Sequence, residues 1–185
     1  MLGYVFWHWK QPNVSVEEYE ARQRAFHRAL AVAPPEGFHG SSCHAVRGAP
    51  WASAGADAYE DHYLVDNARD LDALNAGAVS ASRAAPHDAA AAAAAGGTAG
   101  LYTLRSGGDS LLADVRVAYW FSKPDGMRYD ALFELLDPLV RAGRTALWMR
   151  FMVLGPAPEF CLQSGEPIEI PAPIAARRID LRSVF

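Results

Sequence analysis

The first element that the sequence predicts is a β-strand at the start of the chain. Residues 3–10 are dense in aromatic and β-branched types and end at the turn Gln11-Pro12-Asn13, which is typical of a β-strand followed by a turn. Ser15 stands three residues before Glu18, a capping-box spacing, and apolar positions then recur at helical intervals until Pro34. The pattern therefore predicts a strand and then a helix at the start of the chain.

Further strands and helices are expected up to residue 108. Strands are predicted at 37–47, 59–65 and 101–104 and a helix at 68–79, with an exposed loop at 48–58. Pro86 opens another helical segment, whose alanine run ends at Gly96-Gly97. Proline near the start and glycine past the end are helix signals, so we expect this helix to stop before the glycines.

The same order of elements begins again after a Gly-Gly-Asp break at 107–109. Strands are predicted at 115–122, 145–154, 159–163 and 176–185, and a helix at 129–142. A proline-rich stretch at 164–173 stands where the first half has its second helix. We therefore divide the chain into halves at 1–108 and 109–185, which together form one compact domain.

Two local echoes indicate that the halves are copies of one unit. Trp7-x-x-Lys10 ends the first strand of one half, and Trp120-x-x-Lys123 ends the first strand of the other. Leu-Arg-Ser occurs in both final strands, at 104–106 and 181–183. The shared order of these echoes favours a duplication.

Both faces of the central strands are expected to be buried. A β-α-β-β-α-β unit carries its helices on one face of the sheet, so the other face needs separate cover. Both alternating sets of side chains in Tyr4 to Trp9 are bulky, and Leu147 to Leu154 is apolar on both sides apart from Arg150. The expected fold class is therefore α+β, with two ferredoxin-like halves packed sheet to sheet around a small central cavity.

This repeated element order resembles the dimeric α+β barrel superfamily in its fused, two-half form. The resemblance covers nearly the whole chain and rests on element order and aromatic strands. It implies an intrachain α+β barrel. Its members include cofactor-free monooxygenases, muconolactone-isomerase-like enzymes, stress-response barrel proteins and haem-binding relatives of chlorite dismutase, so the fold does not fix a function.

Composition excludes several classes of partner. The chain has seventeen Lys and Arg and twenty-one Asp and Glu, which gives a net charge of −4, and its basic residues form no cluster. Neither nucleic acid nor an anionic membrane is therefore an expected partner. No segment approaches about eighteen uninterrupted apolar residues, the length of a membrane span. Cys43 and Cys161 are the only cysteines, which indicates free thiols and predicts a cytoplasmic location.

Three histidines on predicted strands, His8, His44 and His62, are the first candidate catalytic residues. If they point into the space between the sheets, their imidazoles could exchange protons with a ligand. The alternative is that each makes a structural hydrogen bond. A metal site would need them to converge with Asp61 or Glu60, and no ligand spacing such as HxH or HExxH occurs, so we expect neither a metal nor a cofactor.

A second set of candidates lies in the other half. The turn at 155–160 presents Glu159 beside a strand, where its carboxylate could act as a base, and Arg150 lies on the preceding strand. The alternative is an Arg150–Glu159 ion pair across a hairpin. Tyr119 and Trp148, with Arg150, are candidate ligand-binding residues, although packing in the core explains them equally well. Cys43 and His44 do not form a nucleophile–base pair, because adjacent strand residues point to opposite faces.

Three functions remain open from the sequence. The first is a protein that binds a small apolar or aromatic molecule in its central cavity, as a cofactor-independent monooxygenase, isomerase or cyclase. The second is a non-catalytic protein whose sheet edges or faces assemble a homodimer or larger oligomer. The first requires a closed cavity of about 300 Å³ or more with convergent polar groups, whereas the second requires a filled interior and a buried interface above about 1,000 Å². The third, a haem-binding barrel, is disfavoured because the second half has no histidine.

Overall fold

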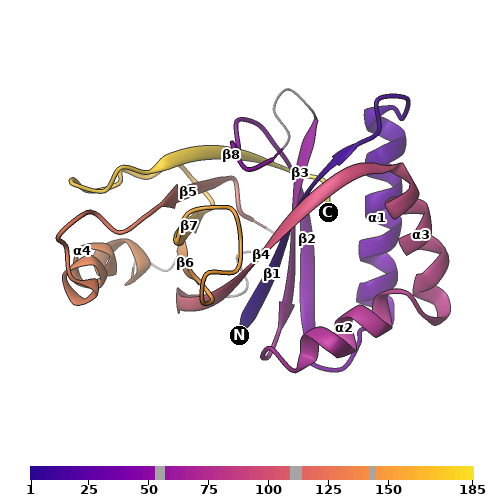
Figure 1. Cartoon of the computed structure of the whole chain (residues 1–185), viewed down its shortest axis with the longest axis horizontal. Helices are drawn as coiled ribbons and strands as arrows, with labels where there is room; N and C mark the ends of the chain where they lie inside the picture. Colours follow the sequence, from indigo (N-terminus) through magenta and orange to yellow (C-terminus); the bar gives the residue numbers. More distant parts are fainter. Residues whose placement is uncertain (53–56, 109–113, 142–144) are drawn as a thin grey trace.

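Eight antiparallel strands close into a barrel in the computed structural model, which describes residues 1–52, 57–108, 114–141 and 145–185. In chain order the elements are β1 (Leu2–Lys10), α1 (Val16–Val32), β2 (Phe38–Val46), β3 (Ala58–Val65), α2 (Asp70–Ala78), the 3-10 helix η1 (Ala81–Arg83), α3 (Ala84–Ala93), β4 (Ala94–Gly107), β5 (Val117–Phe121), α4 (Tyr129–Arg141), β6 (Thr145–Arg150), β7 (Phe160–Ser164) and β8 (Arg177–Ser183). Figure 1 shows α1, α2 and α3 on one side of the barrel and α4 on the opposite side. No helix among the described residues is long and apolar enough to cross a membrane.

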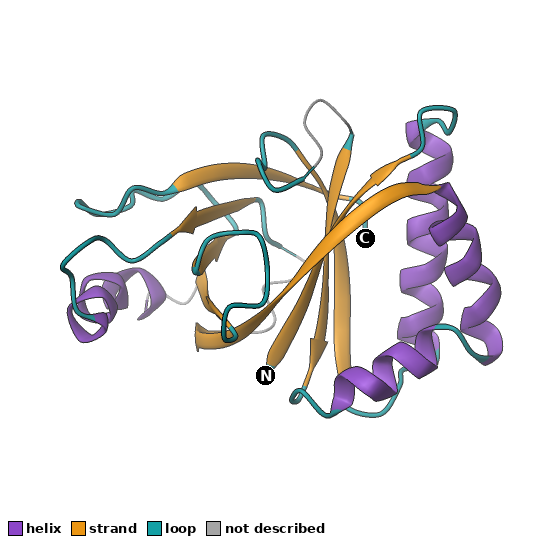
Figure 2. Ribbon diagram, in the orientation of Figure 1, coloured by secondary structure: helices purple, strands orange, loops and turns teal. Residues whose placement is uncertain are grey.

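The two halves of the barrel have the same strand order. Around the barrel the strands run β4-β1-β3-β2 and then β8-β5-β7-β6, which is the ferredoxin-like order met twice. The halves are joined where β2 pairs with β8 and β4 pairs with β6. The expected fold class, a duplicated α+β barrel within one chain, is therefore confirmed (Figure 2).

Helix α1 begins where its capping sequence predicts. The Ser15 hydroxyl accepts a hydrogen bond from the Glu18 backbone N–H at 3.1 Å. One face of the helix buries Tyr19, Phe26 and Leu30 against the sheet of the first half. This contact sets the layer in which the candidate site lies.

The alanine-rich helix stops before the glycines as predicted, but the strand that follows is much longer than the predicted 101–104. Helix α3 ends at Ala93, and β4 begins immediately and contains Gly96 and Gly97. A Cβ atom on Gly97 would lie 2.3 Å from Cζ of Phe6, so the strand passes this ring closely because glycine is there. The glycines therefore also mark a close approach of backbone to an aromatic side chain.

The predicted strand at 145–154 is too long. β6 ends at Arg150, and Met152 has a left-handed φ of 56° in the turn that follows. Met152 and Val153 are 71% and 81% exposed, so the expected burial on two faces fails beyond residue 150. The chain turns here because Phe151 and Leu154 exchange backbone hydrogen bonds with Leu101 of β4.

Aromatic side chains fill the interior of the barrel. Trp7 lies edge-on to Trp120 with ring centroids 5.5 Å apart, and Tyr102 lies edge-on to the same ring at 5.3 Å. Trp7, Tyr102 and Trp120 belong to one buried cluster, which also includes Trp148. The two sheets therefore cover each other as expected, but packed side chains occupy the place of the expected central cavity.

Candidate functional site

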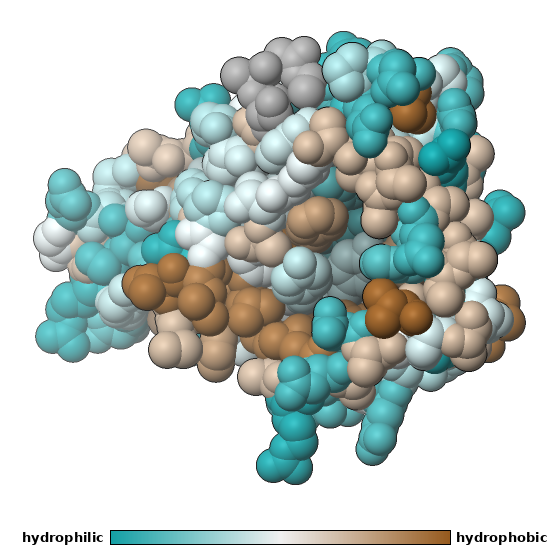
Figure 3. Space-filling model, turned by 45° about the vertical axis from the view of Figure 1, so that its right-hand side comes forward, coloured by the Kyte–Doolittle hydropathy of each residue, from teal (hydrophilic) through white to brown (hydrophobic). Residues whose placement is uncertain are grey.

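A cavity of about 540 Å³ lies between helices α1–α3 and the outer face of β1 and β3. We call it the helix-side cavity. Figure 3 shows this side of the molecule, where the surface is hollowed between hydrophobic side chains. Most of the lining is apolar, and it includes Tyr4, Phe6, Phe26, Tyr63, Leu71 and Leu101. Volume and lining are those of a small-molecule site.

Strand alternation decides which polar residues reach this cavity. On β1 the side chains of Tyr4, Phe6 and His8 line it, and on β3 those of Asp61 and Tyr63 do. These strands pair so that Phe6 faces Asp61, which places both on the same side of the sheet. The neighbouring residues on each strand point into the barrel instead.

A buried carboxylate is the centre of the polar part of the site. The Tyr63 hydroxyl donates to Asp61 Oδ2 at 2.8 Å, and the same oxygen lies 3.1 Å from His8 Nε2 and 3.3 Å from His27 Nε2. The Tyr19 hydroxyl lies 2.5 Å from His8 Nδ1. We call these five residues, His8, Tyr19, His27, Asp61 and Tyr63, the Asp61 cluster.

The electrostatics of the Asp61 cluster favour an ionised carboxylate among neutral phenols. Burial alone would raise the pKa of Asp61, but the imidazoles of His8 and His27 outweigh it and hold the pKa well below its ordinary value. Burial, reinforced by the Asp61 charge, raises the pKa of Tyr19 and Tyr63. The carboxylate can therefore stabilise an imidazolium beside it, while the two hydroxyls serve as hydrogen-bond donors.

A second polar cluster lies on the opposite face of the same strands, inside the barrel. Trp7 Nε1 donates to Glu60 at 2.7 Å, and His62 Nε2 lies 2.9 Å from Glu60 Oε1. Trp148 Nε1 donates to Gln163 Oε1 at 2.9 Å. All these side chains are buried in the packed interior. Gln163 Nε2 lies 3.2 Å from His62 Nε2 and so links the two halves, and none of these side chains lines the helix-side cavity.

The three candidate histidines are not brought together. His62 and His44 point into the space between the sheets as expected, where the backbone register sets His44 opposite Glu60, but packed side chains fill that space. Burial and the nearby His62 lower the pKa of His44 to about 4. His8 points the other way, against expectation, and lines the helix-side cavity. The catalytic roles of all three stay predictions.

The second-half candidates lie elsewhere again. Glu159 accepts a hydrogen bond from the Tyr129 hydroxyl at 2.7 Å, and Arg150 donates to the Ala157 carbonyl at 2.8 Å, so their side chains pair with other groups instead of the expected ion pair. The Tyr119 hydroxyl accepts from the Ile168 backbone N–H at 3.0 Å. With Trp148 in the barrel interior, none of these four residues lines the helix-side cavity.

Sequence reasoning missed Tyr19 and His27 and treated Asp61 only as an optional ligand. One signal was present: Asp61 lies in the middle of a strand buried along its whole length. A carboxylate in such a strand needs compensating charges or hydrogen bonds from elsewhere in the fold. The buried face of the capped helix, with His27 between Phe26 and Leu30, is where such a partner should have been sought.

The chain folds as an α+β barrel of two halves that is closed within one chain, with a pocket between its helices and its sheet. Solved structures of the same fold include a candidate monooxygenase from Fusobacterium nucleatum, with TM-score 0.66 and 9% identity over 100% of this chain and 92% of that one. An anthrone oxidase-like protein matches with TM-score 0.54 and 11% identity over 99% and 93% of the two chains. A candidate chlorite dismutase matches with TM-score 0.52 and 13% identity over 99% and 95%. No family model and no curated protein matches the sequence.

Proposed function

We propose that the protein binds a small, largely aromatic molecule in the helix-side cavity and removes a proton from it at the Asp61 cluster. The observation that carries this proposal is the coincidence of a cavity of about 540 Å³ with a buried carboxylate flanked by two imidazoles. Ionisable groups held in such surroundings beside a cavity are typical of active sites.

The lining indicates the chemical class of the ligand. Rings of Tyr4, Phe6, Phe26 and Tyr63 would contact a flat apolar body. Tyr19 and His8 offer polar atoms at the sheet and at α1, so one end of the ligand should carry an acidic O–H or C–H group. A phenol or a polycyclic ketone with an activated methylene group fits both requirements.

Tyr19 is the residue that would receive the proton. Tyr19 lines the cavity and its hydroxyl is hydrogen-bonded to His8 Nδ1, while His8 Nε2 lies beside Asp61. A proton taken from the ligand by the Tyr19 oxygen replaces the one that Tyr19 passes to His8. The imidazolium that results is stabilised by the Asp61 carboxylate.

Oxygenation is the reaction class that we favour for the deprotonated ligand. A carbanion or phenolate formed in an apolar cavity is electron-rich, and with O₂ as co-substrate an activated methylene group is converted to a carbonyl with release of water. The descriptions of two proteins of this fold, a candidate monooxygenase and an anthrone oxidase-like protein, support this choice. Isomerisation and cyclisation would begin with the same proton transfer.

Binding is tested with 2-naphthol, a fluorescent aromatic acid whose emission changes when it loses its proton. Wild-type protein should bind it saturably. Leu74→Trp, which fills the cavity, should abolish binding, whereas Val79→Trp adds the same side chain at an exposed position and should not. Equal binding by the two variants would contradict the proposed location.

Turnover is tested with anthrone by oxygen uptake. Tyr19→Phe should still bind 2-naphthol but lose about 100-fold in the rate of oxygen uptake, because it removes the hydroxyl that relays the proton. Tyr129→Phe removes a hydroxyl at the surface of the second half and should leave the rate unchanged. Binding without turnover in the wild type would leave a binding protein and refute the enzymatic part of the proposal.

A further inference from the structure

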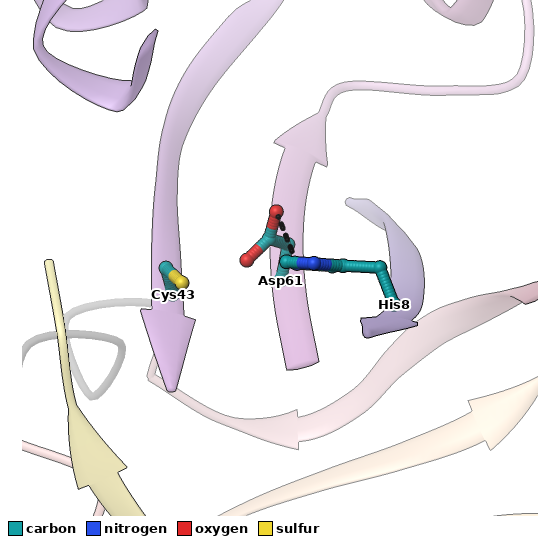
Figure 4. Close-up of side chains that lie close together, drawn as sticks. All are labelled: His8, Cys43 and Asp61. Atoms are coloured by element: carbon teal, nitrogen blue, oxygen red, sulfur yellow. Dashed lines mark ion pairs between the residues drawn. The ribbon is translucent and has the colours of Figure 1, made fainter. Parts of the chain in front are cut away.

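Three side chains of different metal-ligand types meet at the sheet wall of the helix-side cavity. The nearest ligand atoms of His8, Cys43 and Asp61 all lie within 4.8 Å of one another. Figure 4 shows them on three adjacent strands, with Asp61 between the other two. Because Cys43 pairs with Asp61 in the β2–β3 register, the backbone itself fixes this convergence.

Two buried ligand atoms of this group make no hydrogen bond. They are Asp61 Oδ1 and His8 Nε2, of which Nε2 is ion-paired with the other carboxylate oxygen, Oδ2, at 3.1 Å, and both residues are only 1% exposed. Buried polar atoms without partners are rare, and each one calls for a structural reason. A cation between the imidazole, the carboxylate and the thiol would satisfy both atoms.

The other atoms of His8 and Asp61 make contacts of the kind that orient metal ligands. His8 Nδ1 is engaged by the Tyr19 hydroxyl, which leaves Nε2 to point at Asp61. On the carboxylate, Oδ2 is held by Tyr63 and lies beside His27, so Oδ1 is the oxygen that remains available. Metal-binding histidines and carboxylates are usually held by such partners on their other atoms.

We propose that His8, Cys43 and Asp61 bind one divalent transition-metal ion of borderline softness, of which Zn²⁺ is the leading candidate. Imidazole nitrogen, thiolate sulfur and carboxylate oxygen are the three ligand types that Zn²⁺ takes in proteins. His8 and Asp61 line the cavity, so the fourth position of a tetrahedral ion would open toward it. Three protein ligands with one open position is the arrangement of catalytic zinc sites.

Ion binding requires the Cys43 thiol to lose its proton. Burial raises the pKa of this thiol, so in the ion-free protein it carries the proton. The incoming cation takes the thiolate as a ligand and the proton is released to solvent. No change of oxidation state is involved.

The inference does not rest on the proposed function, because ion binding is measured without any organic ligand. An ion on His8 Nε2 would leave the imidazole proton on Nδ1, so the ion-bound protein could not pass a proton from Tyr19 to His8, and the two proposals describe different states of the site. Chelator-treated protein that still binds 2-naphthol but takes up no ion would support the first proposal and overturn this one. Protein that takes up the ion but does not bind 2-naphthol would support this proposal and contradict the first.

The test is a titration of the chelator-treated full chain with Co²⁺, followed by absorbance. One equivalent should produce a thiolate-to-cobalt charge-transfer band in the near ultraviolet, and Zn²⁺ should displace it. Cys43→Ser should abolish the band. Cys161→Ser is the matched control, since Cys161 is equally buried but lies on β7, and it should leave the band intact.

Two further variants guard against misfolding of Cys43→Ser. Asp61→Asn should weaken Co²⁺ binding at least tenfold. Tyr19→Phe, which removes the hydroxyl at His8 Nδ1 but none of the three ion ligands, should weaken it about 10- to 100-fold without removing the band. Wild-type protein that gives no band at stoichiometric Co²⁺, or a band that depends on Cys161 instead, would overturn the proposal.

Discussion

The two halves of the barrel share a strand order but use the layer between sheet and helices differently. In the first half this layer contains the helix-side cavity and the Asp61 cluster. In the second half α4 and the segment that follows β7 cover the sheet with apolar side chains, which form one buried cluster that includes Phe121, Leu132, Leu136, Leu147, Phe160 and Leu162. One half is built around a polar centre and the other around a hydrocarbon core.

Strand pairing makes the comparison specific. Trp7 pairs with Glu60 and its counterpart Trp120 pairs with Cys161, and the next pair along is Phe6–Asp61 in one half and Tyr119–Leu162 in the other. By the same registers His8, Cys43 and Asp61 correspond to Phe121, Leu147 and Leu162. Since the second half folds with apolar residues at these positions, the fold does not require polar ones. The buried polar groups of the first half are best explained by function.

The largest expected effect comes from transferring the carboxylate between the halves. Leu162→Asp should destabilise the protein by about 3 to 5 kcal/mol, because a buried charge without a partner is costly and no histidine lies in that layer. Asp61→Leu should cost less than half as much, because the adjacent cavity can take the extra volume. Urea unfolding of both variants measures the difference, and equal losses would refute the asymmetry between the halves.

A smaller effect is expected from the glycines of β4, which have no counterpart in β8. Gly97→Ala should destabilise the protein by about 2 kcal/mol, because the new Cβ would lie 2.3 Å from the Phe6 ring and 2.9 Å from the Trp7 carbonyl. Gly40→Ala is the control: its Cβ would meet nothing within 4 Å. Thermal unfolding should separate the two, and a similar drop in both variants would show that the close approach is not the cause.

The smallest effect concerns the ion pair between α1 and β8. Burial alone would raise the pKa of Glu20, but Arg182 and Arg24 outweigh it and lower the pKa. A carboxyl group whose pKa is lower in the folded state stabilises the fold above its unfolded pKa, and this contribution is lost as pH falls through the folded value. Arg182 is half exposed, so the contribution should stay below about 1 kcal/mol.

Glu20→Gln tests this ion pair. The variant should be less stable than the wild type at pH 7, and the gap should close as the pH falls from about 5 to about 3, where the wild-type carboxylate becomes protonated. Unfolding free energies at several pH values measure it. A gap that is unchanged at acidic pH would mean that the Glu20 charge is not responsible.

Periodicity in the sequence was sufficient to predict the barrel, because apolar alternation and helix capping are local. The Ser15 cap placed the start of α1 correctly, and the repeated order of elements predicted the strand order that both halves share. The errors arose where a distant contact overrides a local signal. The small residues at 94–100 carry no local strand signal, yet they belong to β4, where Gly97 leaves space for the Phe6 ring.

The candidate site was harder to predict for the same reason. His8 was identified from its strand, but which face it occupies depends on the helices that cover one side of the sheet. His27 lies on a different element, and only the packing of α1 against β3 brings it within 3.3 Å of Asp61. Periodicity groups residues by face within one element and says little about which elements meet.

Closure of the barrel within one chain governs how the protein can be assembled. Both lateral strands of the first half, β2 and β4, obtain their outer hydrogen-bonding partners, β8 and β6, only from the second half. During synthesis the first half therefore emerges with two unpaired edges, which are prone to pair with other chains until the later strands arrive. A fragment that ends before β6 should accordingly seek another copy of itself, and that copy would supply the missing edges.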